Sequence, residues 1–502
     1  MNRAAPAQVE CKNLFSPPLS NMTRSLCALC VFAAFLSGCV NQQAEIAKYR
    51  GILNSDVEGQ IPPLEPHEQL TMVRALLLAN QDNENLMIRG EDYIQAMNDK
   101  DRAFSQFLPT ISLQPNYTIL DNSEAKSTSG TTTGQAVGTL GGFKPVGKTL
   151  RRFEAPVIGG GNLFHGFRDV AALESTKWSM EQRRQLMLDA QKTLMLDVAE
   201  GYYQVLRVEA LMEVLKKSLL AQQERVRDAQ GKLNAGVGRP LDLAQAEAQV
   251  ASTRVQMEQA YGDEANARTL LAFLIGAKEV SGPLVDDYAV AANPPNIEDL
   301  LFNAWSNRED YKAAKAVVEA DVYNVNAAIG EYYPSVTLNI TGYLFRENFT
   351  DASKWNTLLQ VNLPIFSAGV IEADVRTAWS RLRQAALEES LIRRNIEQQV
   401  RTLHQNLLTS TRKLRELDSE IKAAAEAYRQ AQAETKAGTG IFLNEITAQQ
   451  VLLNSELDLA NEIFNRKVID LDLRRATGTL RLGALQRAAT QPTTEPTTMP
   501  TK

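Results

Sequence analysis

The feature that most constrains this chain is a stretch of coiled-coil spacing from about Val370 to Arg475 that is interrupted only at Gly438-Thr439-Gly440. Apolar or small residues recur along its first arm at steps of three, four and seven, as they do in supercoiled helices. No proline interrupts this arm for roughly 68 residues, so as a helix it is about 100 Å long. A helix of that length does not fit a compact globular domain. The stretch therefore predicts one long helical hairpin.

The hairpin occurs twice in the chain. Gly236, Gly238 and Leu241 recur at the same spacing as Gly438, Gly440 and Leu443, and Phe164 recurs as Phe366. Self-similarity at a fixed period is the signature of a tandem duplication. We predict a first structural repeat over residues 67–277, a linker at 278–296 and a second repeat over 297–480.

The four cysteines all lie at or before Cys39, so the body of the chain holds neither a disulfide framework nor a cysteine metal site. Arg24 precedes an apolar run that is too short to span a bilayer and ends in Leu36-Ser37-Gly38-Cys39. This ending resembles a bacterial lipobox, which implies a signal peptide at 1–38, acylation of Cys39 and, because Val40 follows, sorting to the outer membrane. The alternative is a plain secretory signal with an incidental cysteine.

The two ends of the mature chain have the composition of segments without a packed core. Residues 39–66 are polar and end in a proline cluster, which predicts an extended, acylated tether. Residues 481–502 are rich in Thr and Pro, which predicts a disordered tail.

Each repeat also contains two stretches with the period of a strand. Between Pro334 and Pro364, apolar and polar residues alternate over Val336–Thr341 and again over Trp355–Leu363. The first repeat has a less regular pair at Ile111–Leu120 and Leu150–Ile158. At about 9 to 11 residues, such strands are long enough to cross a bilayer at a tilt. The Ser-, Thr- and Gly-rich segment 127–134 predicts an exposed extracellular loop, and Gly159-Gly160-Gly161 a flexible junction between strand and helix.

The order of elements predicts a mainly α-helical fold with a membrane β-barrel. Each repeat reads helix, strand, strand, long helix, glycine turn, shorter helix. The first and last helices together match the long helix in length, so they are expected to lie end to end beside it. Four strands in lipid leave two open edges and enclose no lumen, so several chains must share one barrel. Three chains give a 12-stranded β-barrel that continues into a 12-helix periplasmic α-barrel. A sheet in a soluble domain with a coiled-coil stalk is the alternative.

Nothing in the sequence indicates an enzyme, a cofactor or a nucleic-acid partner. The three histidines, His67, His165 and His404, have no partner at metal-ligand spacing. Gly159-Gly160-Gly161 is not followed by the Lys-Ser/Thr of a phosphate loop. The formal charge of −6 does not favour nucleic acid.

The ordered set of junction and tip sequences resembles the TolC-like outer-membrane factor family over roughly residues 65 to 480. The matching pieces are Phe107-Leu108-Pro109, Pro364-Ile365-Phe366-Ser367-Ala368-Gly369 and the two tip sequences that begin at Gly236 and Gly438. The lipobox is similar to that of the family's lipoprotein branch. The resemblance implies a homotrimeric channel in the Gram-negative outer membrane, anchored by lipid and extending into the periplasm.

The resemblance also implies partners and cargo. The channel is expected to dock at its tips onto a periplasmic adaptor (membrane fusion) protein and an inner-membrane transporter of the resistance-nodulation-division type, and to export small molecules such as drugs and toxic compounds. Two alternatives stay open: the outer-membrane duct of a type I protein secretion system, and a structural coiled-coil periplasmic lipoprotein without a pore.

The hairpin tips are the candidate functional site. Capping alone predicts positive φ at Gly236 and Gly438. The recurring leucines and Asp242/Asn444 suggest a hydrophobic turn contact, an N-cap and a docking surface. The residues expected to dock the adaptor are Gly236, Gly238, Leu241, Asp242, Gly438, Gly440, Leu443 and Asn444. Asn444 stands where the family commonly has Asp, and Thr447 where a further Asp can lie. We therefore expect no aspartate ring. Asn444, Glu445 and Thr447 are the candidates for lining the periplasmic aperture, and Glu445 is the candidate replacement carboxylate.

Overall fold

The computed structural model describes residues 41–55, 62–65, 67–120, 150–291, 295–347 and 353–483. The chain divides into two units, residues 1–48 and residues 49–502. Of the first unit, only residues 41–48 are described, and they belong to the start of a helix. The signal peptide with Cys39, the loop at 127–134 and residues 484–502 of the tail, predicted above, lie outside the described residues.

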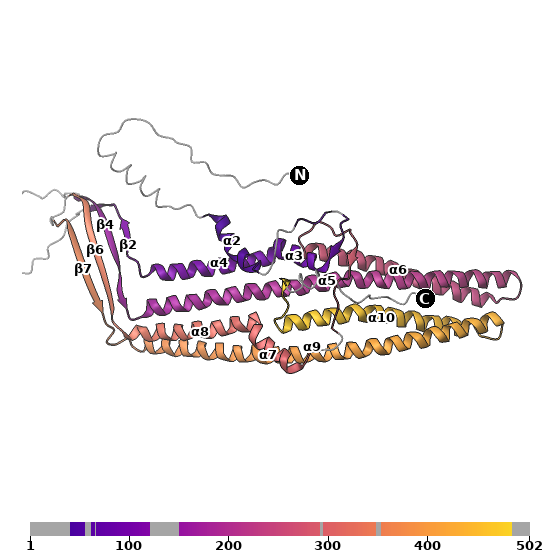
Figure 1. Cartoon of the computed structure of the whole chain (residues 1–502). Coiled ribbons are helices and arrows are strands. Elements are labelled where there is room, and N and C mark those ends of the chain that lie inside the picture. The colour runs from indigo at the N-terminus through magenta and orange to yellow at the C-terminus, as the bar shows by residue number, and fades with distance from the viewer. Residues whose placement is uncertain are drawn as a thin grey trace, which may run out of the picture. The chain divides into compact units, whose positions relative to one another are not determined.

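The two halves of the chain repeat one order of elements (Figure 1). The described elements are α2 (Gln42–Leu53), β1 (Leu70–Thr71), α3 (Met72–Asp82), α4 (Glu84–Ser105), β2 (Thr110–Leu113), β3 (Asn116–Leu120), β4 (Leu150–His165), α5 (Arg168–Asn234), α6 (Pro240–Leu274), β5 (Leu284–Val285), α7 (Ile297–Asn307), α8 (Glu309–Ile329), the 3-10 turn η1 (Gly330–Tyr332), β6 (Ser335–Glu347), β7 (Trp355–Asn362), α9 (Val370–Ala437) and α10 (Phe442–Ala476).

The second unit is built around two long helices. α5 has 67 residues and α9 has 68, while α6 and α10 have 35 each. α5 packs against α4, α6, α8 and α10, and α9 packs against α7, α8 and α10. α8 and α10 follow one another along α9, as the lengths predicted, and α4 and α6 do so along α5 (Figure 1). The helical layer therefore has α4 and α6 at one flank and α9 at the other.

Apolar positions at coiled-coil spacing form the contacts between these helices. Ile396, Val400 and Leu403 of α9 are buried against Leu300 and Ala304 of α7. A larger cluster surrounds Tyr202 of α5, whose hydroxyl group donates to the carbonyl oxygen of Leu70 or Val285 and accepts from the N–H of Val285. These bonds join α5 to the parallel β1–β5 pair.

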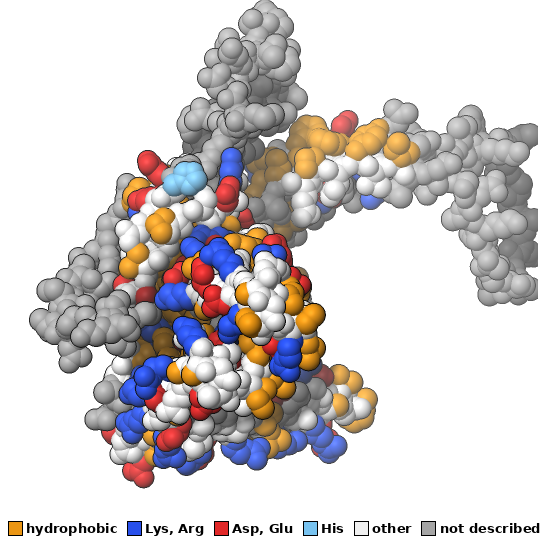
Figure 2. Space-filling model, turned by 90° about the vertical axis from the view of Figure 1, so that its right-hand side faces the viewer, with side chains coloured by type: hydrophobic (Ala, Val, Ile, Leu, Met, Phe, Trp, Pro, Cys, Tyr) orange, Lys and Arg blue, Asp and Glu red, His pale blue; other side chains and the backbone are white. Residues whose placement is uncertain are grey.

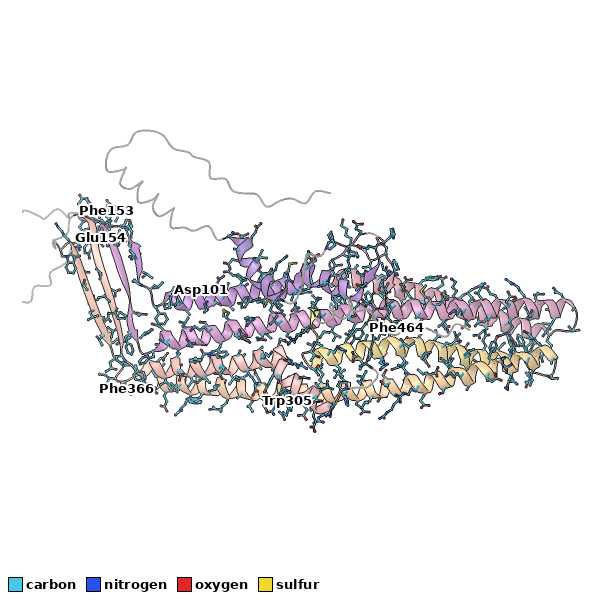
Figure 3. The ribbon with its side chains drawn as sticks, in the orientation of Figure 1. Asp101, Phe153, Glu154, Trp305, Phe366 and Phe464 are labelled. Carbon is cyan, nitrogen blue, oxygen red and sulfur yellow. The ribbon has the colours of Figure 1, made fainter. Side chains whose placement is uncertain are left out.

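The remaining strands form one antiparallel sheet at the end of the long helices opposite to the hairpin turns (Figure 1). Its order is β2-β4-β6-β7, and β3 also pairs with β4. Among the described strands, β7 at one edge and β2 and β3 at the other each pair on one side only. Phe153 and Glu154 lie near the far end of the sheet, and Phe366 lies at its junction with the helices (Figure 3). No described helix is long and apolar enough to cross a membrane.

Two predicted elements near the amino terminus differ from the structure. α2 lies within the segment predicted as an extended tether, because Tyr49 and Leu53 are buried in a cluster with Leu86 and Met187. The first repeat, predicted to open at residue 67 with one helix, has its first helix only from Met72. The predicted helix is divided at Asn83, whose side chain caps α4 at the N–H of Leu86 and donates to the carbonyl oxygen of Leu274.

The glycine run and the first strand also differ from prediction. Gly159, Gly160 and Gly161 are not a flexible junction, because they lie inside β4 and pair with Ile340, Asn339 and Leu338 of β6. A Cβ at Gly160 would overlap Oδ1 of Asn339 and lie 2.9 Å from the carbonyl oxygen of Leu338, which explains the glycine. The strand predicted over Ile111–Leu120 is divided into β2 and β3 at Pro115, which has no N–H to donate.

Candidate functional site at the hairpin tips

The two hairpin turns have the same hydrogen-bonding pattern. Gly236 and Gly438 have φ of +74° and +76°, as predicted. After each of them, two consecutive N–H groups donate to one carbonyl oxygen of the last helical turn, that of Lys232 in the first hairpin and that of Glu434 in the second. This pattern ends a helix at a residue in the left-handed region. Capping therefore accounts for the first glycine of each turn.

The second glycine of each turn is required for a different reason. Gly238 and Gly440 do not have positive φ. A Cβ at Gly238 would lie 2.7 Å from the backbone nitrogen of Leu233, and one at Gly440 would lie 2.8 Å from Cβ of Glu434. The chain turns so closely over the helix end that only glycine fits.

The predicted N-cap role of Asp242 and Asn444 is wrong. The N-caps of α6 and α10 are Arg239 and Ile441, and neither makes a side-chain capping bond. Asp242 lies in the first turn of α6, after Pro240, and accepts hydrogen bonds from Nη2 of Arg239 at 2.8 Å and from Nε at 3.2 Å. The second tip has Ile441 in the position of this arginine.

Apolar side chains are exposed at both tips. Leu241 is 57% exposed and Leu443 is 52% exposed, with Val237 and Ile441 beside them at 79% and 60%. Isolated exposed apolar residues are common, but here they repeat at both turns. These exposed leucines therefore do not make the predicted hydrophobic turn contact within the chain. They present an apolar surface at the end of each hairpin.

A cleft of 780 Å³ lies between the two hairpins. It is lined mainly by polar and charged side chains, among them Asp228, Lys232, Arg239, Asp242 and Gln432. Arg225 and Glu445 also border it.

Arg225 of α5 and Glu445 of α10 form a buried ion pair across the hairpins, with Nε 3.1 Å from Oε1. The two side chains are 5% and 7% exposed. Nη2 of Arg225 also donates to the hydroxyl group of Tyr428 on α9 at 3.1 Å. One guanidinium group therefore joins three helices, α5, α9 and α10. Glu445 is thus engaged within the chain, while Asn444 and Thr447, the other aperture candidates, are exposed.

Sequence reasoning did not find Arg225. The signal was present, since Arg225 occupies an inward position of α5 between the buried Gln222 and Ala229. A charge on the apolar face of a coiled coil requires a partner, and Glu445 stands in the corresponding hairpin.

The described residues contain no group of three or more His, Cys, Asp or Glu side chains that could hold a metal ion. His165 contacts Asp169 at 3.0 Å, and His404 contacts the carbonyl oxygen of Pro295.

A family model described as "Outer membrane efflux protein" matches residues 95–277 and 300–479. The chain belongs to the outer membrane efflux protein family. The two matched segments follow the two repeats. Members of this family are channel proteins of the Gram-negative outer membrane that extend into the periplasm, and this efflux protein is one of them.

Individual relatives of this efflux protein are distant. The outer membrane efflux protein BepC of Brucella suis is 27% identical over 325 residues, which are 63% of this chain and 70% of BepC. The probable outer membrane lipoprotein SilC of Salmonella typhimurium is 22% identical over 302 residues, 57% of this chain and 63% of SilC. The crystal structure of VceC from Vibrio cholerae has the same fold, with a TM-score of 0.70 over 81% of this chain and 96% of VceC at 17% identity.

Proposed function

We propose that three copies of this efflux protein form the outer-membrane duct of a tripartite efflux system. The observation that carries this proposal is the placement of two unsatisfied surfaces at opposite ends of helices about 100 Å long. At one end is a sheet with two open edges, and at the other are two tips with exposed leucines.

The sheet requires further copies because of its edges. Within the part of the chain that the structure describes, β7 and the β2–β3 edge have unpaired backbone groups, each of which costs several kcal/mol in hydrocarbon. Apolar side chains are exposed on these strands, for example Ile111 at 77%, Leu359 at 59% and Val361 at 63%, as a lipid-facing surface requires. Pairing of β7 with the β2–β3 edge of a neighbouring copy removes both edges. Three copies give a barrel of twelve strands and a tube of twelve helices.

The tips are the docking surface for a periplasmic adaptor protein. The exposed Val237 and Leu241 at one tip, and Ile441 and Leu443 at the other, offer paired apolar surfaces to a helical hairpin of the adaptor. The adaptor in turn joins the duct to an inner-membrane transporter, for which we propose the resistance-nodulation-division type. The exported cargo is small molecules, and the transporter selects them because the duct itself is generic.

The tips also control access to the duct. Separating the two hairpins would break the Arg225–Glu445 pair and leave two charges without partners in a buried site. The closed arrangement is therefore the resting state. An adaptor that binds both tips can supply the free energy that moves them apart.

The amino terminus anchors the duct. We propose that residues 1–38 are removed and that Cys39 becomes the acylated first residue of the mature chain. Mass spectrometry of the purified protein is expected to find acyl chains at Cys39. An unmodified Cys39 peptide, or cleavage at another bond, would contradict the anchor without affecting the duct.

Light scattering of the detergent-extracted protein tests the shared barrel. A mass of three chains is expected. A stable single chain that inserts into lipid and conducts ions would overturn the proposal. Affinity purification after crosslinking in cells identifies the adaptor and the transporter.

A further inference from the structure

The outer face of α9 has a row of cations, which we call the basic stripe. Its members are Arg394, Arg401, Arg412, Arg415, Lys422 and Arg429. All six side chains are exposed, and most follow one another at a spacing of seven. They lie opposite to the face of α9 on which Leu403, Leu417 and Ala424 are buried. Blue side chains gather along the lower margin of Figure 2, the side on which α9 lies in Figure 1.

The outer face of α6, at the other flank, has small side chains instead of a row of cations. Opposite to the buried Val250 and Met257 runs a row of exposed residues, which we call the small stripe: Ala244, Ala248, Ala251, Val255, Gly262 and, among them, Glu258. No atom lies within 4 Å of a Cβ built on Gly262. The small stripe is a shallow surface with one carboxylate, which suits long cationic side chains.

Within one chain, the charges of the two stripes do not pair with each other. Among the described residues, Glu258 and Arg415 take part in no ion pair, and Lys422 and Arg429 pair only with exposed neighbours on their own helix, Asp418 and Glu426.

Contacts within the chain show which residues of α6 and α9 are level. Gln249 of α6 donates to Gln450 of α10, and Ser455, farther up α10, donates to Glu420 of α9 at 2.8 Å. Because α6 and α10 both ascend from the tips, Arg254 of α6 is about level with Glu420 of α9. The pairing of Lys413 with Glu462 gives the same correspondence.

The correspondence places an anion and a cation at the same height. Since α6 and α9 run in opposite directions, Glu258 is level with Glu416, the neighbour of Arg415. The offset between Glu258 and Arg415 is about 1.5 Å along the axis.

We propose that the part of the basic stripe from Arg412 to Arg429 in one copy lies on the small stripe of the next, with Arg415 beside Glu258. This inference rests on the proposed three-chain duct, in which rotation about the long axis keeps residues level. The contact joins two different surfaces, so its repetition closes a ring. Exposed ion pairs add little to the stability of the trimer. The stripes instead fix the register in which two copies meet, since any other pairing of flanks places like charges together.

Cysteine crosslinking tests the seam, because the body of the chain has no cysteine. The variant with Glu258→Cys and Arg415→Cys is oxidised in outer-membrane fractions and run on a non-reducing gel. Covalent dimers and trimers are expected. The matched control combines Glu258→Cys with Glu416→Cys, because Glu416 is level with Glu258 but turned by about 100° around α9. The control is expected to crosslink at least about tenfold less.

The size of the uncrosslinked protein, measured by light scattering, separates failure of the seam from failure of the duct. Three chains without a crosslink in the Glu258→Cys, Arg415→Cys variant, or with equal crosslinking in the control, overturn the seam and leave the duct intact. A single chain overturns both. A charge exchange adds an independent reading: Glu258→Arg and Arg415→Glu alone are each expected to lower the temperature at which the trimer dissociates, and the double variant to restore it. Additive losses in the double variant would contradict the pairing.

Discussion

Nε of Arg225 and Oε1 of Glu445 lie 3.1 Å apart, in a site where both side chains are almost fully buried, and they join α5 of the first hairpin to α10 of the second. Tyr428 of α9 bonds to the same guanidinium group. The two halves of a duplicated chain are thus linked near their tips by one charged contact.

Removing one partner of this pair is expected to loosen the tips. Arg225→Ala leaves the Glu445 carboxylate buried and unpaired, which typically costs about 3–5 kcal/mol. We expect a lower thermal midpoint and a larger resting conductance in planar bilayers. Arg225→Met with Glu445→Leu removes both charges and keeps the volume, so it is expected to recover most of the stability. If Arg225→Ala and the double variant were equally destabilised, the ion pair would not be the cause.

The tip glycines test docking. Gly438→Trp places a bulky residue at φ +76°, a conformation that costs roughly 1–2 kcal/mol in an ordinary residue. The turn is displaced, and with it Leu443. Trimer formation and insertion into the outer membrane are expected to persist, while adaptor crosslinking and export fall sharply.

Gly231→Trp is the control for the tip variant. Gly231 lies in the last turns of α5, is exposed, and has no atom within 4 Å of a Cβ position. Near-normal export is expected of it. Normal export by Gly438→Trp, or failure of that variant already at trimer formation, would show that the tip is not the docking surface.

The glycine run of β4 tests the sheet. Gly160→Ala brings a methyl group into overlap with Oδ1 of Asn339 and to 2.9 Å from the carbonyl oxygen of Leu338, so the β4–β6 pairing must shift. Gly159→Ala meets nothing nearer than 3.9 Å. We expect Gly160→Ala to reduce assembled trimer in outer-membrane fractions severalfold and Gly159→Ala to have little effect. Equal yields would mean that packing at Gly160 does not limit assembly.

Burial of Asp189 on α5 makes stability depend on pH. Desolvation raises the pKa of this carboxyl group above its ordinary value of 3.8, despite the nearby Arg475. The folded state therefore holds the proton more tightly than the unfolded state, and stability falls as the pH rises through the window just above 3.8. Asp189→Asn is expected to raise the thermal midpoint at pH 7, with the gain shrinking toward about pH 4. A gain that does not depend on pH would point to packing instead.

The repeated architecture could be predicted from the sequence, because long helices and glycine turns leave local signals. The 68 residues of α9 and the positive φ of Gly236 and Gly438 follow from periodicity and capping alone. The role of Gly160 could not be predicted, because it depends on Asn339 of the other repeat. The inward position of Arg225 is visible in the sequence, but its partner Glu445 also lies in the other repeat. The division of the first helix at Asn83 and the formation of β1 could not be predicted either, because they depend on Leu274 and on β5, which are distant in the sequence.

The proposed pore is tested most directly by the conductance of the purified protein in planar lipid bilayers. Discrete conductance steps are expected, with a larger step conductance for Arg225→Ala than for the wild type. Purified protein that incorporates into the bilayer but never conducts, with or without Arg225, would contradict the duct and favour a coiled-coil lipoprotein without a pore.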